Sequence, residues 1–415
     1  MTRSLPRREV LQKLGVVGSV VFAGCSATTG DEPTTSVDGT TTTDQTSTQT
    51  ATAEPTAENT QTATPEESPC REPESRTSRW RTTTDSRTYD PVVADGIVYV
   101  GGDKPDTLRA FELTDGIEQW RTAVNGMLYV APTVGEDALY YPEYDRVTAL
   151  ARTDGTERWR HDPTGDLTAP AAAADRLVVF GESNHPTMHT TVDDEFDRVV
   201  ALNAADGSVR WRQRFALDER APLTTRPVTL EASVVAASED HVIRAFDLAD
   251  GVAQWSTGVS VPSDMAAFSS GGNTGVVVAS REGTVALDPA DGTTRWRDGR
   301  SSERVVAGGG RIFVARNDVL RALDATDGTD LWTHSTTDRR LVGLAADAEH
   351  VVASFRSRTE KRARLTGFDP QTGCPVWHVS PGVGRLSSPA LGDDTAVVTS
   401  GVADRSVYAV GATEE

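Results

Sequence analysis

The 415-residue sequence predicts an all-β fold, an eight-bladed β-propeller of four-stranded antiparallel blades, and three observations support this prediction. Eight tryptophans recur every 36 to 52 residues, and a period near 40 is typical of repeat architectures. Small residues precede the later tryptophans at fixed distances. The first tryptophan has no repeat before it, whereas the last repeat has no tryptophan. The eight positions are Trp80, Trp120, Trp159, Trp211, Trp255, Trp296, Trp332 and Trp377.

Each repeat predicts four short strands, named a to d from the axis of the ring outward. In the first repeat Pro91 leads strand a, and the apolar run 97–100 forms strand b. Strand c contains Ala110, ten residues before Trp120 in strand d, and an Asp-Gly pair lies between them at 115–116. Asp-Gly between two strand patterns indicates a tight hairpin, because glycine adopts a positive φ at little cost. Four strands in about 40 residues are typical of a propeller blade.

The two chain ends predict how the ring closes. The last repeat supplies strands a to c, near Pro389 and at 395–398 and 406–410, and then stops. We expect the Trp80 strand to complete this blade, with Ala409 paired to Trp80. Seven complete repeats and one shared repeat therefore give eight blades and no open ring end. Each indole is expected to lie against the neighbouring blade.

The first 25 residues have the pattern of an export signal. Arg7 and Arg8 precede an apolar run at 14–23, which is too short to span a membrane, and small residues lead to Cys25. The arginine pair resembles a twin-arginine signal, and Ala-Gly-Cys resembles a lipobox, in which the cysteine receives the lipid. We therefore expect a lipid-anchored protein at the extracellular face of the cytoplasmic membrane. The alternative is an ordinary basic segment followed by an incidental cysteine.

Residues 26–78 are expected to form a disordered stalk, followed by the propeller at 79–415. Between 28 and 64, 16 of 37 residues are Thr and none is aromatic, so this segment has almost nothing to bury. Thr-rich tracts with Pro resemble O-glycosylated stalks, and the alternative is a plain linker.

The charge composition makes nucleic acid a poor partner. The chain has 61 Asp and Glu against 41 Lys and Arg, a net charge of −20, whereas nucleic-acid binding depends on basic residues. Three of the basic residues are Lys and the others are Arg. This acidic, lysine-poor composition resembles proteins of extremely halophilic archaea, and the alternative is an ordinary acidic protein from a GC-rich genome.

The repeat itself resembles a known one. The pattern Ala-Leu-Asp-x-x-x-Gly-x-x-x-Trp, which ends at Gly292 and Trp296, resembles the PQQ-like repeat. That repeat builds eight-bladed propellers in quinoprotein dehydrogenases and in the outer-membrane assembly lipoprotein B family. The second resemblance implies a non-catalytic interaction platform, with protein partners of unidentified kind and a monomeric propeller. Fold alone does not decide function, so a quinone-dependent enzyme and a small-ligand or sugar sensor remain alternatives.

A quinoprotein dehydrogenase would, by this resemblance, hold PQQ on the axis beneath a vicinal cysteine pair and above a tryptophan. The sequence has no Cys-Cys pair, and the repeat positions account for all eight tryptophans. We therefore predict no cofactor and no catalytic residues, and PQQ follows from the resemblance alone.

A candidate metal site lies in the longest repeat, in the insertion between strands b and c. Imidazole and carboxylate groups are sensible ligands for a divalent metal. The alternative is a solvated acidic loop whose histidines are incidental. The candidate ligands are His185, His189, Asp193, Asp194 and Glu195.

A candidate docking loop lies between strands b and c of the seventh repeat, at 356–364. It is basic on an acidic domain, so it could bind an acidic partner or a polyanionic glycan. The alternative is a solvated loop that pairs with acidic neighbours. Its basic residues are Arg356, Arg358, Lys361, Arg362 and Arg364.

Cys70 and Cys374 form a candidate disulfide. Cys374 lies three residues before Trp377, and Cys70 lies seven residues before the equivalent position in the Trp80 strand. Seven extended residues span about 23–25 Å, which is enough to reach the adjacent outer strand. Export would permit the bond, and the alternative is two free thiols.

Overall fold

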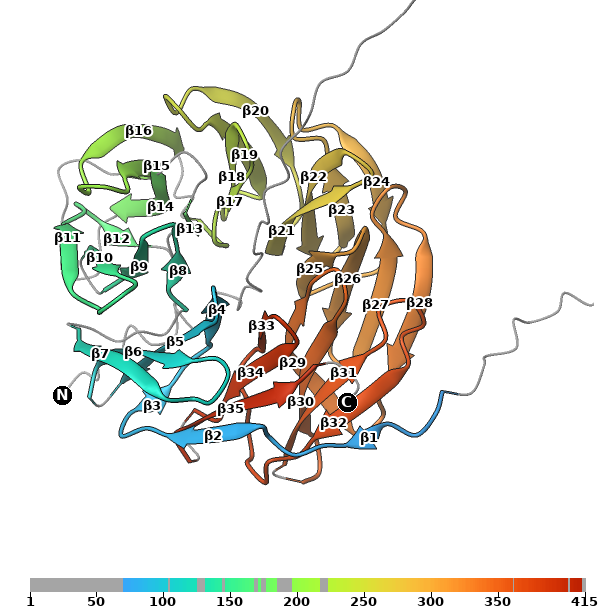
Figure 1. The fold of residues 1–415 in the computed structure, drawn as a ribbon. Helices are drawn as coiled ribbons and strands as arrows, with labels where there is room; N and C mark the ends of the chain where they lie inside the picture. Colours follow the sequence, from blue (N-terminus) through green and yellow to red (C-terminus); the bar gives the residue numbers. More distant parts are fainter. Residues whose placement is uncertain are drawn as a thin grey trace, which may run out of the picture. The chain divides into compact units, whose positions relative to one another are not determined.

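A computed structural model describes residues 70–412, apart from 104, 125–130, 144–145, 168–170, 173–176, 185–195, 217–222, 361 and 402–403. Within these residues all regular secondary structure is β-strand. The strands form eight small sheets arranged as an eight-bladed propeller, as predicted (Figure 1). In most blades the chain runs from an inner strand at the axis to an outer strand at the rim, and the blade's long strands pair with their neighbours in sequence.

The first four blades follow one another along the chain. Blade 1 contains β3 (Arg87–Thr88), β4 (Val92–Ala94), β5 (Ile97–Asp103), β6 (Thr107–Glu112) and β7 (Glu118–Ala123). Blade 2 contains β8 (Thr133–Val134), β9 (Ala138–Pro142), β10 (Val147–Ala151) and β11 (Glu157–His161). Blade 3 contains β12 (Asp166–Leu167), β13 (Ala171–Ala172), β14 (Leu177–Asn184), β15 (Phe196–Asn203) and β16 (Val209–Ala216). Blade 4 contains β17 (Val228–Thr229), β18 (Ser233–Ala237), β19 (Val242–Asp247) and β20 (Ala253–Gly258).

The last four blades also contain the first two strands of the chain, one in blade 7 and the other in blade 8. Blade 5 contains β21 (Pro262–Ser270), β22 (Asn273–Ser280), β23 (Gly283–Leu287) and β24 (Thr294–Asp298). Blade 6 contains β25 (Arg304–Gly308), β26 (Arg311–Arg316), β27 (Val319–Asp324) and β28 (Asp330–Ser335). Blade 7 contains β29 (Arg339–Ala346), β30 (Val351–Ser357), β31 (Ala363–Phe368), β32 (Pro375–Val379) and β1 (Glu74–Ser75). Blade 8 contains β33 (Ala390–Gly392), β34 (Thr395–Thr399), β35 (Ser406–Gly411) and β2 (Trp80–Thr83).

The predicted ring closure is confirmed. Strand β2 is the outer strand of blade 8 and pairs antiparallel with β35, with Trp80 opposite Ala409 (Figure 1). Trp120 stands opposite Ala110 in blade 1 in the same register. The first and last segments of the propeller therefore share one sheet.

The described strands begin earlier than the expected domain start at residue 79. Strand β1 adds a fifth strand to blade 7 and runs parallel to β32, with Glu74 opposite Trp377. The Arg76 backbone N–H extends this ladder by donating to the His378 carbonyl. The segment before Trp80 thus covers the outer edge of one blade before the chain enters the next.

Neighbouring blades are joined through the tryptophans. In the outer strand of each blade, the indole Nε1 donates a hydrogen bond of 2.7–3.0 Å to a backbone carbonyl of the following blade. Seven of the indoles also lie on the glycine of that blade's c–d turn, where an added Cβ would overlap the ring. The glycines are Gly116, Gly155, Gly207, Gly251, Gly292, Gly328 and Gly373. The turn glycine is therefore required twice, for its positive φ and for the space that it leaves.

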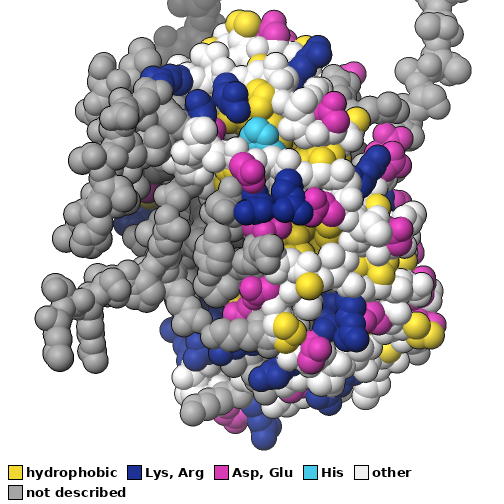
Figure 2. All heavy atoms as spheres, turned by 90° about the vertical axis from the view of Figure 1, so that its left-hand side faces the viewer, with side chains coloured by type: hydrophobic (Ala, Val, Ile, Leu, Met, Phe, Trp, Pro, Cys, Tyr) yellow, Lys and Arg dark blue, Asp and Glu magenta, His cyan; other side chains and the backbone are white. Residues whose placement is uncertain are grey.

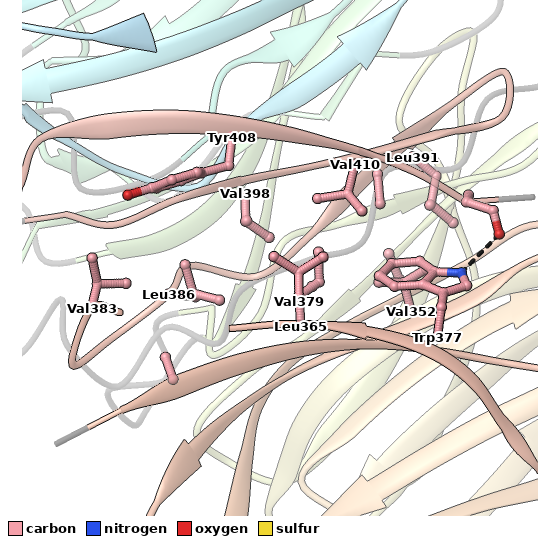
Figure 3. Packing of buried hydrophobic residues seen from close by; sticks show 14 residues of the cluster. Val352, Leu365, Trp377, Val379, Val383, Leu386, Leu391, Val398, Tyr408 and Val410 are labelled. Atoms are coloured by element: carbon pink, nitrogen blue, oxygen red, sulfur yellow. Dashed lines mark hydrogen bonds between the residues drawn. The ribbon is translucent and has the colours of Figure 1, made fainter. Parts of the chain in front are cut away.

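Blade 8 has no such turn glycine, and the indole of blade 7 packs differently against it. Trp377 is 1% exposed, lies over Gly367 of its own blade and donates to the Ala412 carbonyl (Figure 3). Around it, apolar side chains of both blades form one buried cluster, which includes Leu365 and Val410. The core of the protein thus consists of layers between blades, and each layer buries about 150–250 Å² of one indole.

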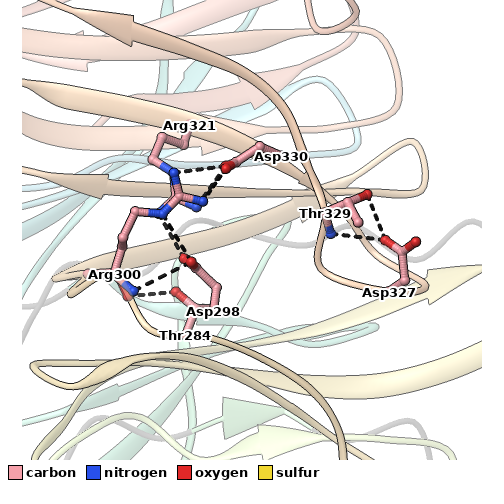
Figure 4. A network of polar contacts seen from close by, with 8 residues as sticks. Thr284, Asp298, Arg300, Arg321, Asp327, Thr329 and Asp330 are labelled. Atoms are coloured by element: carbon pink, nitrogen blue, oxygen red, sulfur yellow. Dashed lines mark hydrogen bonds and ion pairs between the residues drawn. The ribbon is translucent and has the colours of Figure 1, made fainter. Parts of the chain in front are cut away.

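A buried ion network adds to one of these layers. Arg321 on β27 is 7% exposed and bonds Asp298 of blade 5 and Asp330 of its own blade, both at 2.8 Å (Figure 4). Arg109 on β6 has the same position in its repeat and contacts Asp85 and Glu118. In both cases an arginine of a third strand connects the outer strand of its own blade to the outer strand of the preceding blade or to the segment just after it.

Candidate functional site

Four charged residues stand at the start of inner strands or just before them, in blades 1, 4, 5 and 6, and the exposed Arg385, five residues before the inner strand of blade 8, interacts with the first of them through its charge. Each inner strand begins beside the end of its second strand, as the pairing of Pro262 with Ser280 and of Arg304 with Ala315 shows. These starts therefore lie at the end of the ring that carries the turns between second and third strands, called here the b–c end. We call the five residues the axial cluster, and they are Asp90, Arg226, Asp264, Arg304 and Arg385.

Asp264 is the most buried member of the cluster. It lies on β21 and is 4% exposed. Its carboxylate accepts the Met265 N–H at 3.0 Å and the Val305 N–H of blade 6 at 3.1 Å. Burial raises the pKa of this carboxyl to about 7, although these hydrogen bonds and the charges of Arg304 and Arg226 act to lower it. A carboxyl of this kind changes its charge near neutral pH.

Asp90 joins the first and last blades at the same end of the ring. It precedes β4, and its carboxylate accepts the Ser388 N–H of blade 8 at 2.9 Å. Burial raises the pKa of Asp90, while the bond from Ser388 and nearby arginine charges act in the opposite direction. Gly343 of blade 7 makes this arrangement possible, because a Cβ there would overlap the Ser388 backbone.

Arg226 reaches from blade 4 to blade 2. It precedes β17 and donates from Nη2 to the Ala131 carbonyl, which precedes β8, at 3.0 Å. Burial lowers the pKa of its guanidinium to about 10, and the charges of Asp264 and Asp90 only partly offset this effect. Its Nε is buried and has no hydrogen-bond partner among the described residues. The cluster therefore combines dehydrated charges of both signs with an unused donor.

The sequence contains a signal for two members of the cluster, Asp90 and Arg226. In blades 1, 2, 4 and 8 a proline leads the inner strand, and the residue before that proline makes an inter-blade hydrogen bond. Asp90 bonds Ser388, and Arg226 bonds Ala131, so the four positions form two pairs. A residue before proline is held extended, which directs each of these positions along the start of its strand.

The predicted docking loop is shorter than expected. Arg356 lies in β30 and Arg364 in β31, because the ladder continues through the pairing of Arg356 with Ala363. The prediction of one loop over 356–364 was therefore wrong at both ends. Arg356, Arg358 and Arg362 are exposed, whereas the Nε of Arg364 is buried. Lys361 lies outside the described residues.

The remaining predicted sites are only partly covered by the described residues. Both Cys70 and Cys374 are disulfide-bonded. The export motif with Arg7 and Arg8, the lipidation residue Cys25 and the whole metal-site candidate lie outside the described residues. Within the described part of the chain, three or more His, Cys, Asp or Glu side chains do not gather in any group that could hold a metal. The metal-site candidate was formed by His185, His189, Asp193, Asp194 and Glu195.

The described residues do not fit a quinone on the axis. A quinone would need an aromatic floor, but every tryptophan of the chain donates its Nε1 to the next blade and lies between blades. No residue of the axial cluster is aromatic.

No helix in the described residues has the length and apolarity to cross a membrane.

Comparison with solved structures gives the same architecture. BamB from Moraxella catarrhalis matches with a TM-score of 0.60 at 13% identity, covering 80% of this chain and 96% of that one. Quinohemoprotein alcohol dehydrogenase from Comamonas testosteroni matches with a TM-score of 0.59 at 14% identity, covering 82% and 77%. A computationally designed protein, Ika8, matches with a TM-score of 0.59 at 16% identity, covering 79% and 97%. At these identities the likeness shows the fold alone.

Sequence comparison identifies the family. No curated protein matches the chain significantly. A family model described as "Outer membrane protein assembly factor BamB" matches residues 69–183, 143–305 and 264–414, which together cover the whole propeller. The repeat pattern, the eight blades and this match agree, and the chain therefore belongs to the BamB-like family of PQQ-type repeat propellers.

Proposed function

We propose that the chain is a non-catalytic protein-interaction platform, exported and lipid-anchored through Cys25 at the extracellular face of the cytoplasmic membrane. The observation that supports it is an exposed basic hairpin at the b–c end of blade 7, formed by Arg356, Arg358 and Arg362. The family description, that of an assembly factor, fits a role in contacting other proteins.

The charge of this hairpin is available to a partner. Arg358 lies 3.4 Å from Asp318, and Arg362 lies 3.9 Å from Glu360, and the side chains of both arginines are at least half exposed. Exposed ion pairs of this kind contribute about 0–1 kcal/mol each, so an acidic surface can replace them at little cost. On the face that Figure 2 shows, acidic and basic side chains are interspersed. We therefore assign docking of an acidic protein surface to the blade 7 hairpin.

A crosslinked pull-down from native membranes, in the salt concentration of the host, tests this proposal. The tagged full chain is compared with a triple variant, Arg356→Gln, Arg358→Gln and Arg362→Gln. The matched control replaces three exposed arginines that follow a tryptophan on outer strands, Arg121, Arg160 and Arg297, by Gln. We expect one stoichiometric partner, lost with the hairpin variant and kept with the control. No partner, or equal loss in both variants, would refute the platform.

The membrane anchor has its own test in the same preparation. The Cys25→Ser variant should leave the membrane fraction and appear in the soluble fraction, because the lipid is attached through this cysteine. A variant that stays on the membrane would refute the lipid anchor while leaving the platform to the pull-down.

A small-ligand sensor is a second candidate, and the axial cluster favours it over a quinone enzyme. Dehydrated charges at the centre of a ring suit recognition of a compact charged ligand, whereas the tryptophans needed for an aromatic floor are engaged between blades.

A further inference from the structure

We propose that the axial cluster binds a small oxyanion, a compact dianion of the carboxylate or phosphate class, at the b–c end of the ring. This inference does not depend on the platform function, and it names a ligand class for the second candidate, the small-ligand sensor.

Local charge is the first argument. The cluster holds three arginines and two aspartates, a balance of +1, in a chain whose net charge is −20. The three guanidinium groups come from blades 4, 6 and 8, so the closed ring brings together charges that are far apart in the sequence. Guanidinium groups recognise carboxylate and phosphate oxygens through paired hydrogen bonds.

The second argument is that three buried donors have no hydrogen-bond partner within the described residues: one belongs to the cluster, one to its neighbour in the chain, and one to the residue whose backbone N–H binds Asp90. They are the Nε of Arg226 and the hydroxyls of Thr225 and Ser388. Thr225 and Ser388 are 5% and 4% exposed, so bulk water does not satisfy their hydroxyls. Buried polar groups in proteins are almost always paired, and each exception calls for a bound water, ion or ligand.

The third argument is that the carboxylates are already held by other groups. Backbone N–H groups of Met265 and Val305 bind Asp264, and that of Ser388 binds Asp90. These bonds fix the aspartates to the framework of the ring. Arg226 likewise uses Nη2 on the Ala131 carbonyl, which fixes the guanidinium and leaves its Nε edge for a ligand.

Calorimetric titration of the purified full chain tests the proposal. Sulfate and malonate serve as probes of the phosphate and carboxylate classes, each against a chloride background of equal ionic strength. We expect saturable binding of one of them, and the one that binds identifies the class. The Arg226→Gln variant should raise its Kd at least tenfold. The matched control, Arg295→Gln, removes an arginine from a rim ion pair and should leave Kd unchanged.

Two further variants keep the test decisive if Arg226→Gln does not fold. Thr225→Val and Ser388→Ala each remove one unpaired hydroxyl while retaining nearly the same volume, and each should weaken binding several-fold. Absence of saturable binding by both probes, or equal binding by wild type and all three cluster variants, would overturn the proposal.

The pH dependence supplies an independent signature. Asp264 faces Arg304 on β25 and Arg226 before β17, and Asp90 and Arg385 complete the charges of the cluster. As Asp264 takes up a proton, the balance of the cluster rises from +1 to +2. Sulfate keeps its charge over this range, so its binding should tighten from pH 8 to pH 6. The Asp264→Asn variant should lose that dependence, and an unchanged dependence would contradict the assignment.

Discussion

The rim and the axis of the ring are built by different rules. At the rim the same contact recurs around the molecule, an indole that donates to the next blade and, seven times, lies on a turn glycine. At the axis only five of the eight blades contribute a charged residue to the cluster, an arginine in three of them and an aspartate in two. The comparison teaches that repetition reports the fold, whereas departure from the repeat distinguishes one blade of this chain from another.

Replacing a turn glycine at the rim should destabilise the protein more than the other substitutions that follow. Gly328 and Gly272 both have positive φ, +74° and +82°, but only at Gly328 would an added Cβ meet an indole, 2.5 Å from Trp296. Both Gly→Ala substitutions carry backbone strain of about 1–2 kcal/mol, and Gly328→Ala adds about 1–3 kcal/mol of overpacking. Chemical denaturation should show a loss of about 2–5 kcal/mol for Gly328→Ala and about 1–2 kcal/mol for Gly272→Ala. Equal losses would mean that the indole contact adds nothing.

The disulfide should rank second among the rim effects. Cys70 and Cys374 are both disulfide-bonded, and removing a native disulfide costs about 2–4 kcal/mol. We expect Cys374→Ser and reductant each to lower Tm, with no additional effect when they are combined. Cys25→Ser should leave the response to reductant intact. A wild type indifferent to reductant would contradict this expectation.

The buried ion network should contribute more than an exposed pair of the same chemistry. Arg321 is 7% exposed between two aspartates, whereas Arg295 and Asp288 are 26% and 30% exposed. Arg321→Met leaves Asp298 without its buried partner and should cost about 2 kcal/mol, less than a fully buried pair because Arg300 remains beside it. Arg295→Met should cost below about 1 kcal/mol. Denaturation of both variants at low and high salt provides the measurement, and similar losses would refute the difference.

The smallest expected effect lies at the axis, where the contribution of Asp264 to stability should depend on pH. The raised pKa of Asp264 means that the folded protein holds a proton that the unfolded chain has released, so this group's contribution to stability falls between pH about 4 and about 7. Relative to wild type, Asp264→Asn should therefore gain about 1 kcal/mol between pH 6 and pH 8. Thermal unfolding at both pH values measures the change. Parallel stability curves for the two proteins would place the pKa of Asp264 outside this range.

The sequence predicted the tryptophan contacts at the rim but not the charged cluster at the axis, and the reason is physical. Every tryptophan stands opposite a small residue, which in seven of the eight cases lies ten positions earlier, and seven of the indoles lie on a turn glycine, so the same letters recur and reveal the blades and their closure. Asp90, Arg226 and Asp264 recur nowhere, and they converge only because the ring closes. Strand β1 escaped prediction because its two residues pair through backbone atoms alone. Arg356 and Arg364 were predicted to lie in a loop because they are charged. Both lie in strands, because backbone hydrogen bonds extend the pairing of β30 with β31 through them.

The outer strand of blade 8 has a consequence for how the protein loses its structure. A linear repeat array can fray from either end, because its terminal repeats have one neighbour each. Here β2 occupies the last place in the sheet of β35, so every blade has two neighbours and the array is cyclic. Melting of any one blade then disturbs two interfaces at once. The expected behaviour is cooperative unfolding of all eight blades, nucleated where β2 detaches.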